Sequence, residues 1–371
     1  MAGVASNKIE LRRVATEHLP MVAAFYRTAW NEGGDESPTE RTPRPEWFER
    51  APAVIAIQGD RIIGYLGTLP MRFWKNGAEV DAHWFKGFMV VPEFRNGPIG
   101  FALVREAMKH VNDVAVLTVQ PASWRLFQAA GLTLVGTVPN YLRLLRPARV
   151  AQTLDLARVP LGRIPNWAIS SARVAQRIGV AGLGGAIAGL GASMAAGVRG
   201  AGEAATTSGL NGADAAMDAT WTRMREATRY AQARDAAYVR ERYADASLFR
   251  CSRVDGKSGS AFTMVRRPRA GGDERLSGLS VAVLSDLMAP LDQAGLILSA
   301  VRRAEDDARA LGADAIVCSA SHPSLGPLLQ RRSWIQIPAN LQFLARMKDA
   351  PPATLADWWL TRADGNSDEG F

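Results

Sequence analysis

The spacing of apolar and polar residues predicts a mixed α/β protein whose first half begins with a helix and continues into strands. Within residues 17–30, apolar side chains recur at the period of one buried helix face: Leu19, Val22, Phe25, Tyr26 and Ala29. Two apolar runs, 53–57 and 62–67, flank a Gln-Gly-Asp-Arg segment and predict a β-hairpin. Asn76 and Gly77 predict a second hairpin turn, after which a further strand runs to residue 91.

The chemistry of the first half is concentrated at residues 88–100, where an apolar strand ends and a helix begins. A short loop follows Pro92, and a helix is predicted next because apolar residues recur at Ile99, Leu103, Ala107 and Val111. This arrangement directs backbone amides and the positive end of the helix dipole to one point, which favours phosphate binding. Arg95 adds a charged donor. An ordinary strand-to-helix turn has the same pattern.

These residues resemble the acyl-coenzyme A loop of the GNAT N-acetyltransferase superfamily. In that family a strand ends in Val-x-Pro, and an aromatic residue and Arg-x-x-Gly-x-Gly follow at a helix start. The matching residues here are Val90, Pro92, Phe94, Arg95 and Gly100. Pro98 replaces the first family glycine and removes one N–H donor, although proline suits a first helical turn. Gly97 still allows a close approach of the backbone.

The resemblance implies a co-substrate and a place for it. The co-substrate is acetyl-coenzyme A or another acyl-coenzyme A. Its pantetheine is expected along a fourth strand that splays from the fifth, at Met89, Val90 and Val91. Its pyrophosphate is expected at the loop and helix start, which comprise Arg95, Asn96, Gly97, Pro98, Ile99 and Gly100.

The resemblance also suggests catalytic residues. Asp81 and His83 lie on the strand that enters the site, and Glu93 lies next to its end, so these three are candidate bases. Each is more often a surface or structural residue. Phe127 occupies the position of a family tyrosine that often protonates the departing thiolate, and a phenyl ring has no proton to give.

The first helix is expected to flank the acceptor. Tyr26 and Trp30 are therefore candidate substrate contacts, together with Trp47 in the following Pro-rich segment. Aromatic residues at helical spacing are more often part of a core.

The second half repeats the plan of the first. Strands are predicted near 249–254, 261–265, 279–284 and 315–318, and a helix over 294–311. Pro121 to Gln128 and Pro323 to Gln330 have the same spacing, which an internal duplication explains. The second copy has Asp292 and no arginine at the loop, so we expect the donor site in the first copy.

The segment between the copies is predicted to be a linker or insertion, basic at first and then rich in Gly and Ala. Its uncharged part, Ile178–Val198, is long enough to cross a bilayer, but it contains seven glycines and much alanine, which contribute little transfer free energy. We expect a mobile linker. Flanking arginines leave weak membrane-surface association through 173–199 open.

The expected fold class is therefore α/β (α+β), with two tandem GNAT-like domains, each a mixed and mostly antiparallel sheet flanked by helices. The expected divisions are an acyl-coenzyme A-binding domain at 1–147, the linker at 148–235, a degenerate GNAT-like domain at 236–350 and a tail at 351–371. Trp358 to Leu360 and Tyr238 to Tyr243 resemble GNAT-like proteins found with polysaccharide-biosynthesis enzymes.

Composition narrows the partners without selecting one. The 371-residue chain has a formal net charge of +8 and a pI near 9.9, which favours acidic partners, and coenzyme A is itself a polyanion. No aromatic and basic nucleic-acid signature stands out, so nucleic acid is not expected. Two cysteines fit a reducing cytoplasm, and four scattered histidines predict no metal site.

The expected activity is transfer of an acyl group, with acetyl favoured, from acyl-coenzyme A to an amine such as an amino sugar or another small molecule. An aminoacyl-tRNA-dependent transferase remains an alternative, because such enzymes also use paired GNAT-like domains. A non-catalytic acyl-coenzyme A-binding scaffold is a second alternative, favoured by Phe127 and Pro98. A homodimer is left open.

Overall fold

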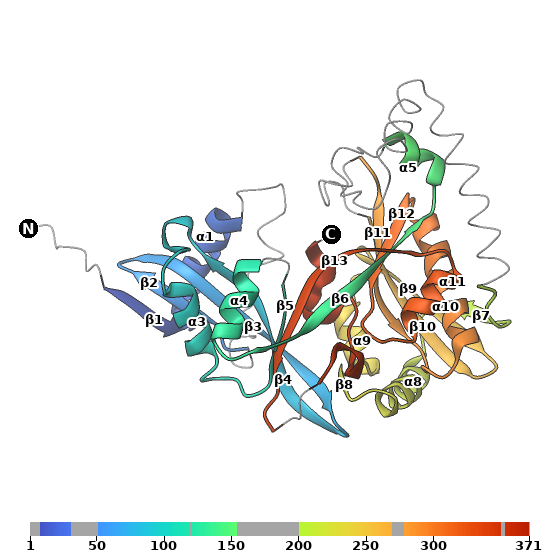
Figure 1. The fold of residues 1–371 in the computed structure, drawn as a ribbon, viewed down its shortest axis with the longest axis horizontal. Helices are drawn as coiled ribbons and strands as arrows, with labels where there is room; N and C mark the ends of the chain where they lie inside the picture. The colour runs from blue at the N-terminus through green and yellow to red at the C-terminus, as the bar shows by residue number, and fades with distance from the viewer. Residues whose placement is uncertain are drawn as a thin grey trace, which may run out of the picture. The chain divides into compact units, whose positions relative to one another are not determined.

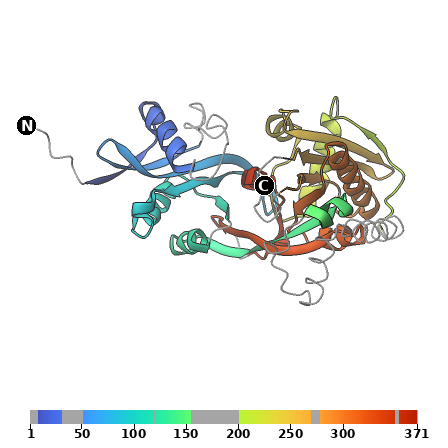
Figure 2. The ribbon, with the colours of Figure 1, turned by 90° about the horizontal axis from the view of Figure 1, so that it is seen from above.

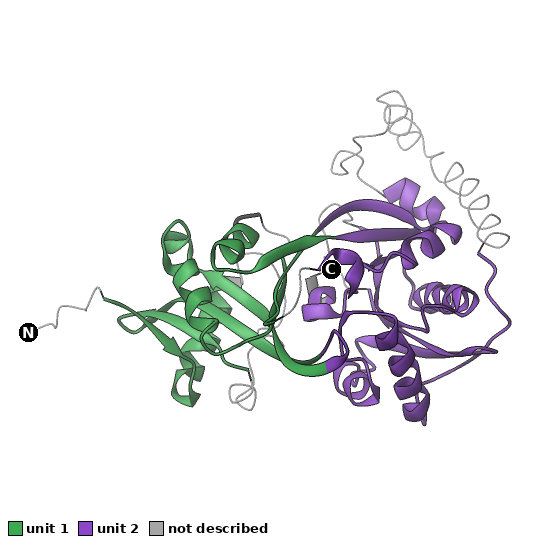
Figure 3. Ribbon diagram, turned by 60° about the horizontal axis from the view of Figure 1, so that its bottom comes forward, with its two compact units in different colours: residues 1–73, 79–137, 341–352 green, residues 74–78, 138–340, 353–371 purple. Residues whose placement is uncertain are grey.

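The computed structural model divides the chain into two compact units (Figure 3). Unit 1 comprises residues 1–73, 79–137 and 341–352, and unit 2 comprises residues 74–78, 138–340 and 353–371. The structure describes residues 8–30, 51–118, 121–153, 200–268, 278–349 and 353–370. Each unit has its own apolar core.

Unit 1 contains a mixed sheet in the order β1-β2-β3-β4-β5-β13. Its strands are β1 (Ile9–Arg13), β2 (Val54–Gln58), β3 (Arg61–Lys75), β4 (Ala78–Val90), β5 (Val114–Thr118) and the end of β13 (Ile335–Arg346). β1, β2 and β3 pair in an antiparallel manner, and β4 pairs with β5 in parallel. The predicted hairpin turn at Asn76 and Gly77 is confirmed, since both have positive φ, 49° and 99°.

Helices cover both faces of the unit 1 sheet (Figures 1 and 2). They are α1 (Leu19–Trp30), α3 (Ile99–Ala107) and α4 (Pro121–Ala129), with short 3-10 turns η1 (Thr16–His18) and η3 (Pro92–Phe94). Gly64 of β3 lies against α3, because a Cβ there would come within 2.8 Å of Leu103. The next residue, Tyr65, contacts Tyr26 of α1 instead. Successive strand residues point to opposite faces, so α1 and α3 lie on opposite faces of β3.

Unit 2 contains a sheet in the order β6-β12-β11-β10-β9-β7. Its strands are β6 (Thr133–Leu144), which begins in unit 1, β7 (Thr206–Ser208), β9 (Phe249–Gly256), β10 (Gly259–Arg266), β11 (Val281–Met288) and β12 (Ala315–Ser319). Two short strands, β8 (Tyr230–Gln232) and β14 (Trp358–Trp359), pair with each other in parallel. The helices are α5 (Pro147–Thr153), α8 (Asp214–Glu226), α9 (Ala236–Arg242), α10 (Ala294–Ala310) and α11 (Leu325–Arg331), with 3-10 turns η5 (Leu355–Asp357) and η6 (Asp364–Gly370).

The predicted repeat is present as a repeated order of elements. β2, β3, β4, α3, β5, α4 and β6 of the first copy correspond to β9, β10, β11, α10, β12, α11 and β13 of the second. Both copies contain one parallel pair, β4 with β5 and β11 with β12. These sheets flanked by helices confirm the predicted fold class.

The last strand of each copy pairs with the other copy. Residues 342–346 of β13 pair with β5 in unit 1, and residues 140–144 of β6 pair with β12 in unit 2. Each unit is therefore completed by a strand that the other half of the sequence supplies. Such an exchange was not part of the sequence prediction, because hydrophobic alternation predicts a strand without identifying its partner.

Two further segments are ordered parts of unit 2. Residues 200–235, which we had grouped with the linker, form β7, α8 and β8, and residues 353–370 carry η5, β14 and η6. The uncharged segment Ile178–Val198 lies outside the described residues. None of the helices in the described part of the chain combines the length and apolar content needed to cross a membrane.

Candidate functional site

The central feature of unit 1 is the separation of β4 from β5. Within the described residues their parallel register contains two pairs, His83 with Val114 and Trp84 with Ala115. β4 then continues to Val90, while β5 continues to Thr118 in pairing with β13. Beyond Trp84, β4 is therefore no longer paired with β5 in the described register. This separation is the splayed fourth strand that the sequence resemblance implies.

Gly87 interrupts the regular alternation of β4 within this separated stretch. Its φ of +68° lies in the left-handed region, which glycine adopts at little cost. Phe85 and Phe88 both contact the ring of Phe127, with centroids 5.8 and 5.4 Å away. Residues three apart point to opposite faces in a regular strand. Their shared contact shows that both rings lie on one face of β4, so the alternation of side chains is interrupted between them, at Gly87.

The loop after β4 carries the predicted phosphate signature. The N–H of Val91 donates to the carbonyl of Ile63 and fixes the end of the strand. Arg95 donates from Nε to the Val90 carbonyl at 3.0 Å, while the residue itself is exposed, as are Asn96, Gly97 and Pro98. The loop is thus held by its own backbone and side chain and is open to a ligand.

Helix α3 begins directly after this loop. The N–H of Ala102 donates to the carbonyl of Pro98, so the amides of the preceding turn have no acceptor within the helix. With the helix dipole they favour an anion at this end. Gly100 is buried, and a Cβ there would come within 2.8 Å of Leu126 and 3.0 Å of Phe88. A larger residue at this position would collide with α4 and β4, so glycine allows α3 to pack closely against both.

A pocket of about 310 Å³ opens beside the loop. Its lining comprises Thr28, Ala29, Arg61, Val91, Pro92, Glu93 and Arg95. Arg61 and Glu93 form an exposed ion pair across it, with Nη2 and Oε1 3.4 Å apart. A hydrogen bond from its own backbone, assisted by Arg61, holds the pKa of Glu93 below its ordinary value. Glu93 is therefore a carboxylate at neutral pH and a weak base.

The three candidate bases do not form one cluster. His83 is partly buried at the point where β4 and β5 separate, and its backbone N–H donates to the Asp113 carbonyl. Asp81 is exposed and lies still earlier on β4. Glu93 lies beyond the other end of the strand. Of the three, His83 lies where β4 and β5 are still paired, next to the point at which the two strands separate.

The two candidate acceptor contacts lie on α1. Tyr26 is buried, and its ring meets that of Tyr65 edge-on with centroids 5.3 Å apart. Trp30 is the last residue of α1, and Trp47 lies outside the described residues. The sequence analysis did not select Tyr65, because this residue lies within an apolar strand and a tyrosine there is expected to be part of the core. The nearby Gly64 and Gly67 were the available signal for a close approach at this strand.

In unit 2, the C-terminal segment occupies the corresponding separation of β11 from β12. Their described register ends at Val283 with Val317. Beyond it, the N–H of Ala363 donates to the Ser285 carbonyl at 2.9 Å, and the N–H of Ser321 donates to the Leu360 carbonyl at 3.2 Å. Residues 358–364 are buried. The chain itself therefore lies where a ligand of the second copy would lie.

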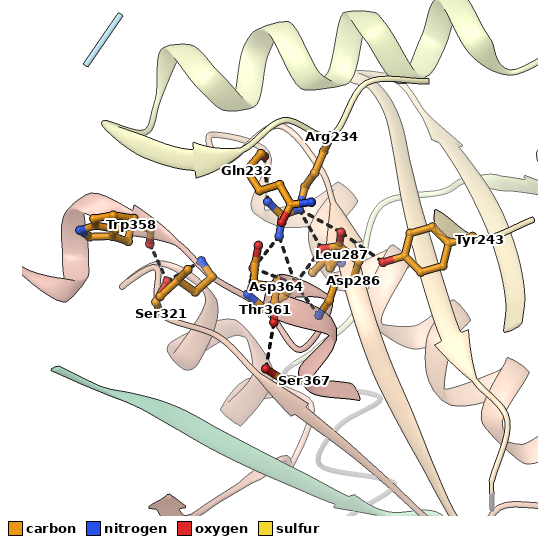
Figure 4. A network of polar contacts seen from close by, with 12 residues as sticks. Gln232, Arg234, Tyr243, Asp286, Leu287, Ser321, Trp358, Thr361, Asp364 and Ser367 are labelled. Carbon is orange, nitrogen blue, oxygen red and sulfur yellow. Dashed lines mark hydrogen bonds and ion pairs between the residues drawn. The ribbon is translucent and has the colours of Figure 1, made fainter. Parts of the chain in front are cut away.

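A buried ion network fixes this segment (Figure 4). Arg234 donates from Nε to Asp286 at 2.9 Å and from Nη2 to Asp364 at 2.7 Å, and all three side chains are fully buried. Thr361 donates from its hydroxyl to Asp286 at 3.0 Å and from its N–H to Asp364 at 2.7 Å. Arg234 thus connects β11 to the tail.

The helix start of the second copy is also covered by the chain. The N–H of Glu203 donates to the Gly295 carbonyl, and the Ser299 hydroxyl donates to the Glu203 carbonyl at 2.8 Å. Asp292 pairs with Arg223 of α8, with both oxygens 3.0 Å from Nη2. A hydrogen bond from Gln293, assisted by Arg223, lowers the pKa of Asp292. An anion is therefore disfavoured at this helix start.

Among the described residues, no group of three or more His, Cys, Asp and Glu side chains is placed to hold a metal ion. Residues 20–132 match the family model described as the acetyltransferase (GNAT) family. No match was found among curated protein sequences.

Several solved structures are similar to nearly the whole chain. A probable N-acyltransferase from Enterococcus faecalis V583 is 9% identical with a TM-score of 0.55, covering 92% of this chain and 72% of that chain. A GCN5-related N-acetyltransferase from Kribbella flavida is 13% identical with a TM-score of 0.53, covering 93% and 72%. Saccharomyces cerevisiae N-myristoyltransferase with bound myristoyl-CoA is 10% identical with a TM-score of 0.55, covering 93% and 80%. At these identities the likeness concerns the fold.

Proposed function

We propose that the chain transfers an acyl group from acyl-coenzyme A to an amine at one donor site, in unit 1. The match of residues 20–132 to the model of the acetyltransferase (GNAT) family supports this proposal. The main support for a donor site in unit 1 is the difference between the two copies. The separated strands and helix start of the first copy adjoin an exposed loop with Arg95, whereas the second copy fills both places with its own chain.

The donor is expected to lie along β4. Exposed Arg95, Asn96 and the first turn of α3 supply a cation and backbone donors for a pyrophosphate. The pantetheine would follow the edge of β4 that faces away from β3, past Val90 and toward Gly87. Since this edge leaves the ladder after Trp84, the thioester would approach Gly87 from the side of the loop.

The acceptor is expected to be an amine that enters beside α1. The pocket at Arg61 and Glu93 lies at the end of this helix and carries charges of both signs. Catalysis requires a neutral amine held against the thioester carbonyl, and much of the rate enhancement can come from this positioning. An amino sugar or another small amine fits this class of acceptor.

Calorimetric titration with coenzyme A and acetyl-coenzyme A, combined with a thiol-release assay over a panel of amines, tests the proposal. We expect Arg95→Ala to weaken coenzyme A binding by about 1–3 kcal/mol, the usual contribution of a charged hydrogen bond. Asp292→Ala is the matched control in the second copy and should change affinity little, because its site is covered by the chain.

Each outcome has a definite reading. An unchanged affinity in Arg95→Ala together with a large change in Asp292→Ala would place the donor site in unit 2. Tight coenzyme A binding without acyl transfer to any amine would favour the non-catalytic scaffold, which the buried Phe127 in place of a proton donor also favours. Absence of coenzyme A binding would reject both.

A further inference from the structure

The pocket beside the loop contains a cation that the proposed donor site does not use. Its lining combines Arg61, the first residue of β3, with Glu93 and Arg95 of the loop. Arg95 is assigned to the pyrophosphate and donates from Nε to the Val90 carbonyl. Among the described residues, the Arg61 guanidinium is hydrogen-bonded to Glu93 alone, at 3.4 Å, which is long for a charged pair. The pocket therefore presents a loosely held guanidinium to a ligand.

The backbone of the loop has little left to offer on this side. The N–H groups of three loop residues already donate to carbonyls of the loop or of β3: Val91, Phe94 and Arg95. The N–H of Glu93 is hydrogen-bonded to its own carboxylate, and Pro92 has no N–H. The Thr28 hydroxyl donates to carbonyls within α1. Recognition of an anion in this pocket therefore depends on side chains, and on Arg61 in particular.

The pocket lies on the α1 side of the sheet. Thr28 and Ala29 of α1 belong to its lining, whereas α3, whose first turn faces the proposed pyrophosphate, lies on the opposite face of β3. Its volume of about 310 Å³ is at the lower end for ligand pockets. It therefore has room for one end of a molecule, such as a carboxylate or phosphate with its neighbouring atoms.

The same face of α1 connects the pocket with the proposed position of the thioester. Val91 lines the pocket, and Gly87 precedes it by four residues, which corresponds to a distance on the order of 10 Å along the strand. A Cβ on Gly87 would come within 2.7 Å of the Tyr26 hydroxyl, and Ala29, one helical turn after Tyr26, lines the pocket. An acceptor that spans the two places is therefore extended.

We propose that Arg61 binds an oxyanion at one end of the acceptor, and that the acceptor is an extended amine whose carboxylate or phosphate lies about 10 Å from the reacting nitrogen. The inference rests on the proposed function. Glu93 pairs with Arg61 in the structure, so the acceptor's anion competes with this carboxylate for the guanidinium. Arg61 determines specificity and takes no part in the bond changes at the thioester.

The test uses two pairs of probe amines that differ in charge: 6-aminohexanoate with 6-aminohexanamide, and 6-aminohexyl phosphate with 6-aminohexanol. Initial rates with acetyl-coenzyme A give the KM for each amine. Arg61→Gln should raise the KM for the charged member of each pair about five-fold, the upper range for a partly exposed charge pair, without changing that of the neutral member. Glu93→Gln should lower the KM for the charged member, because the competing carboxylate is removed.

These opposite effects of the two variants are not expected if the ion pair only supports the fold. Arg12→Gln is the matched control, because it breaks an exposed ion pair with Glu10 on β1 and should change neither KM. Equal changes for charged and neutral amines in Arg61→Gln would overturn the inference. A higher KM for the charged amines in Glu93→Gln would also overturn it.

The 3′-phosphate of coenzyme A is a second source of the same chemistry, and titrations with coenzyme A and 3′-dephospho-coenzyme A distinguish it. A loss of affinity for coenzyme A alone in Arg61→Gln would assign this residue to the donor and overturn the inference. If the wild-type protein binds coenzyme A but acylates no amine, the proposed function fails. Calorimetry with 6-aminohexyl phosphate then still tests the anion site: binding that Arg61→Gln weakens supports it, and absence of binding to the wild type overturns it.

Discussion

Arg234 and Asp286 form an ion pair in which both side chains are completely buried, with Nε 2.9 Å from Oδ2. Asp364 of the C-terminal segment lies 2.7 Å from Nη2 of the same guanidinium. Two carboxylates, one from a strand and one from the tail, thus depend on one cation. Burial of a charge is costly unless it is paired, so this cluster makes the position of the tail specific.

We expect Arg234→Met to destabilise unit 2 by about 3–5 kcal/mol, because it leaves two buried carboxylates without their cation. Arg240→Met is the control: Arg240 pairs with Asp214, both are largely exposed, and such a pair contributes about 1 kcal/mol or less. Urea unfolding followed by circular dichroism measures both. Equal losses in the two variants would contradict the stabilising role of the buried cluster.

The pH dependence of stability should change in Asp364→Asn. Burial, with the neighbouring Asp286 carboxylate, outweighs Arg234 and raises the pKa of Asp364 to about 6 from its ordinary 3.8. Because the folded pKa is the higher one, the folded state binds this proton more tightly. The resulting stabilisation is complete below about pH 4 and is lost as pH rises through 6.

Asparagine is uncharged in both the folded and the unfolded state. Asp364→Asn should therefore remove the pH-dependent part of the unfolding free energy that residue 364 contributes. The difference in unfolding free energy between wild type and variant should therefore shift by about 3 kcal/mol between pH 4 and pH 7, in favour of the variant at the higher pH. Urea unfolding across this range measures it. A difference that is constant with pH would show that Asp364 remains ionised in the folded state.

The wild-type chain should bind one coenzyme A. The separation of β11 from β12 holds residues 358–364, and the start of α10 is covered by Glu203, so within the described residues the second copy fills both donor positions with its own chain. Calorimetric stoichiometry measures this directly. Two equivalents bound per chain would show that the tail leaves its position when ligand is present.

Pro98→Gly should tighten coenzyme A binding and slightly lower the melting temperature. The substitution restores an N–H at the helix start, and one hydrogen bond contributes about 1 kcal/mol. It also releases the backbone of a residue that now has φ −76°, an angle that proline favours, at a cost to stability of about 0.4–1 kcal/mol. Unchanged affinity with a lower melting temperature would show that this amide does not reach the phosphates.

The sequence by itself determined those features that depend on local pattern. The Asn76-Gly77 turn, the strand ending before Pro92 and the helix from Ile99 follow from backbone preferences and from the period of apolar residues, and the structure contains all three. The repeat was visible because Pro121 to Gln128 and Pro323 to Gln330 keep one spacing, and α4 and α11 occupy these segments. The family match at residues 20–132 agrees with the motif at Val90 to Gly100.

Only the tertiary structure decided which distant residues meet. β5 pairs with β13 and β12 pairs with β6, and a strand's own alternation does not name its partner. Arg234 and Asp364 are far apart in sequence, and from the sequence each is expected to be an exposed charge. The structure shows that they are buried together as an ion pair. The sequence pattern likewise assigns Tyr65 to the core, because it lies in an apolar strand. Its contact with Tyr26 of α1 and its approach to Gly87 of β4 are visible only in the folded structure.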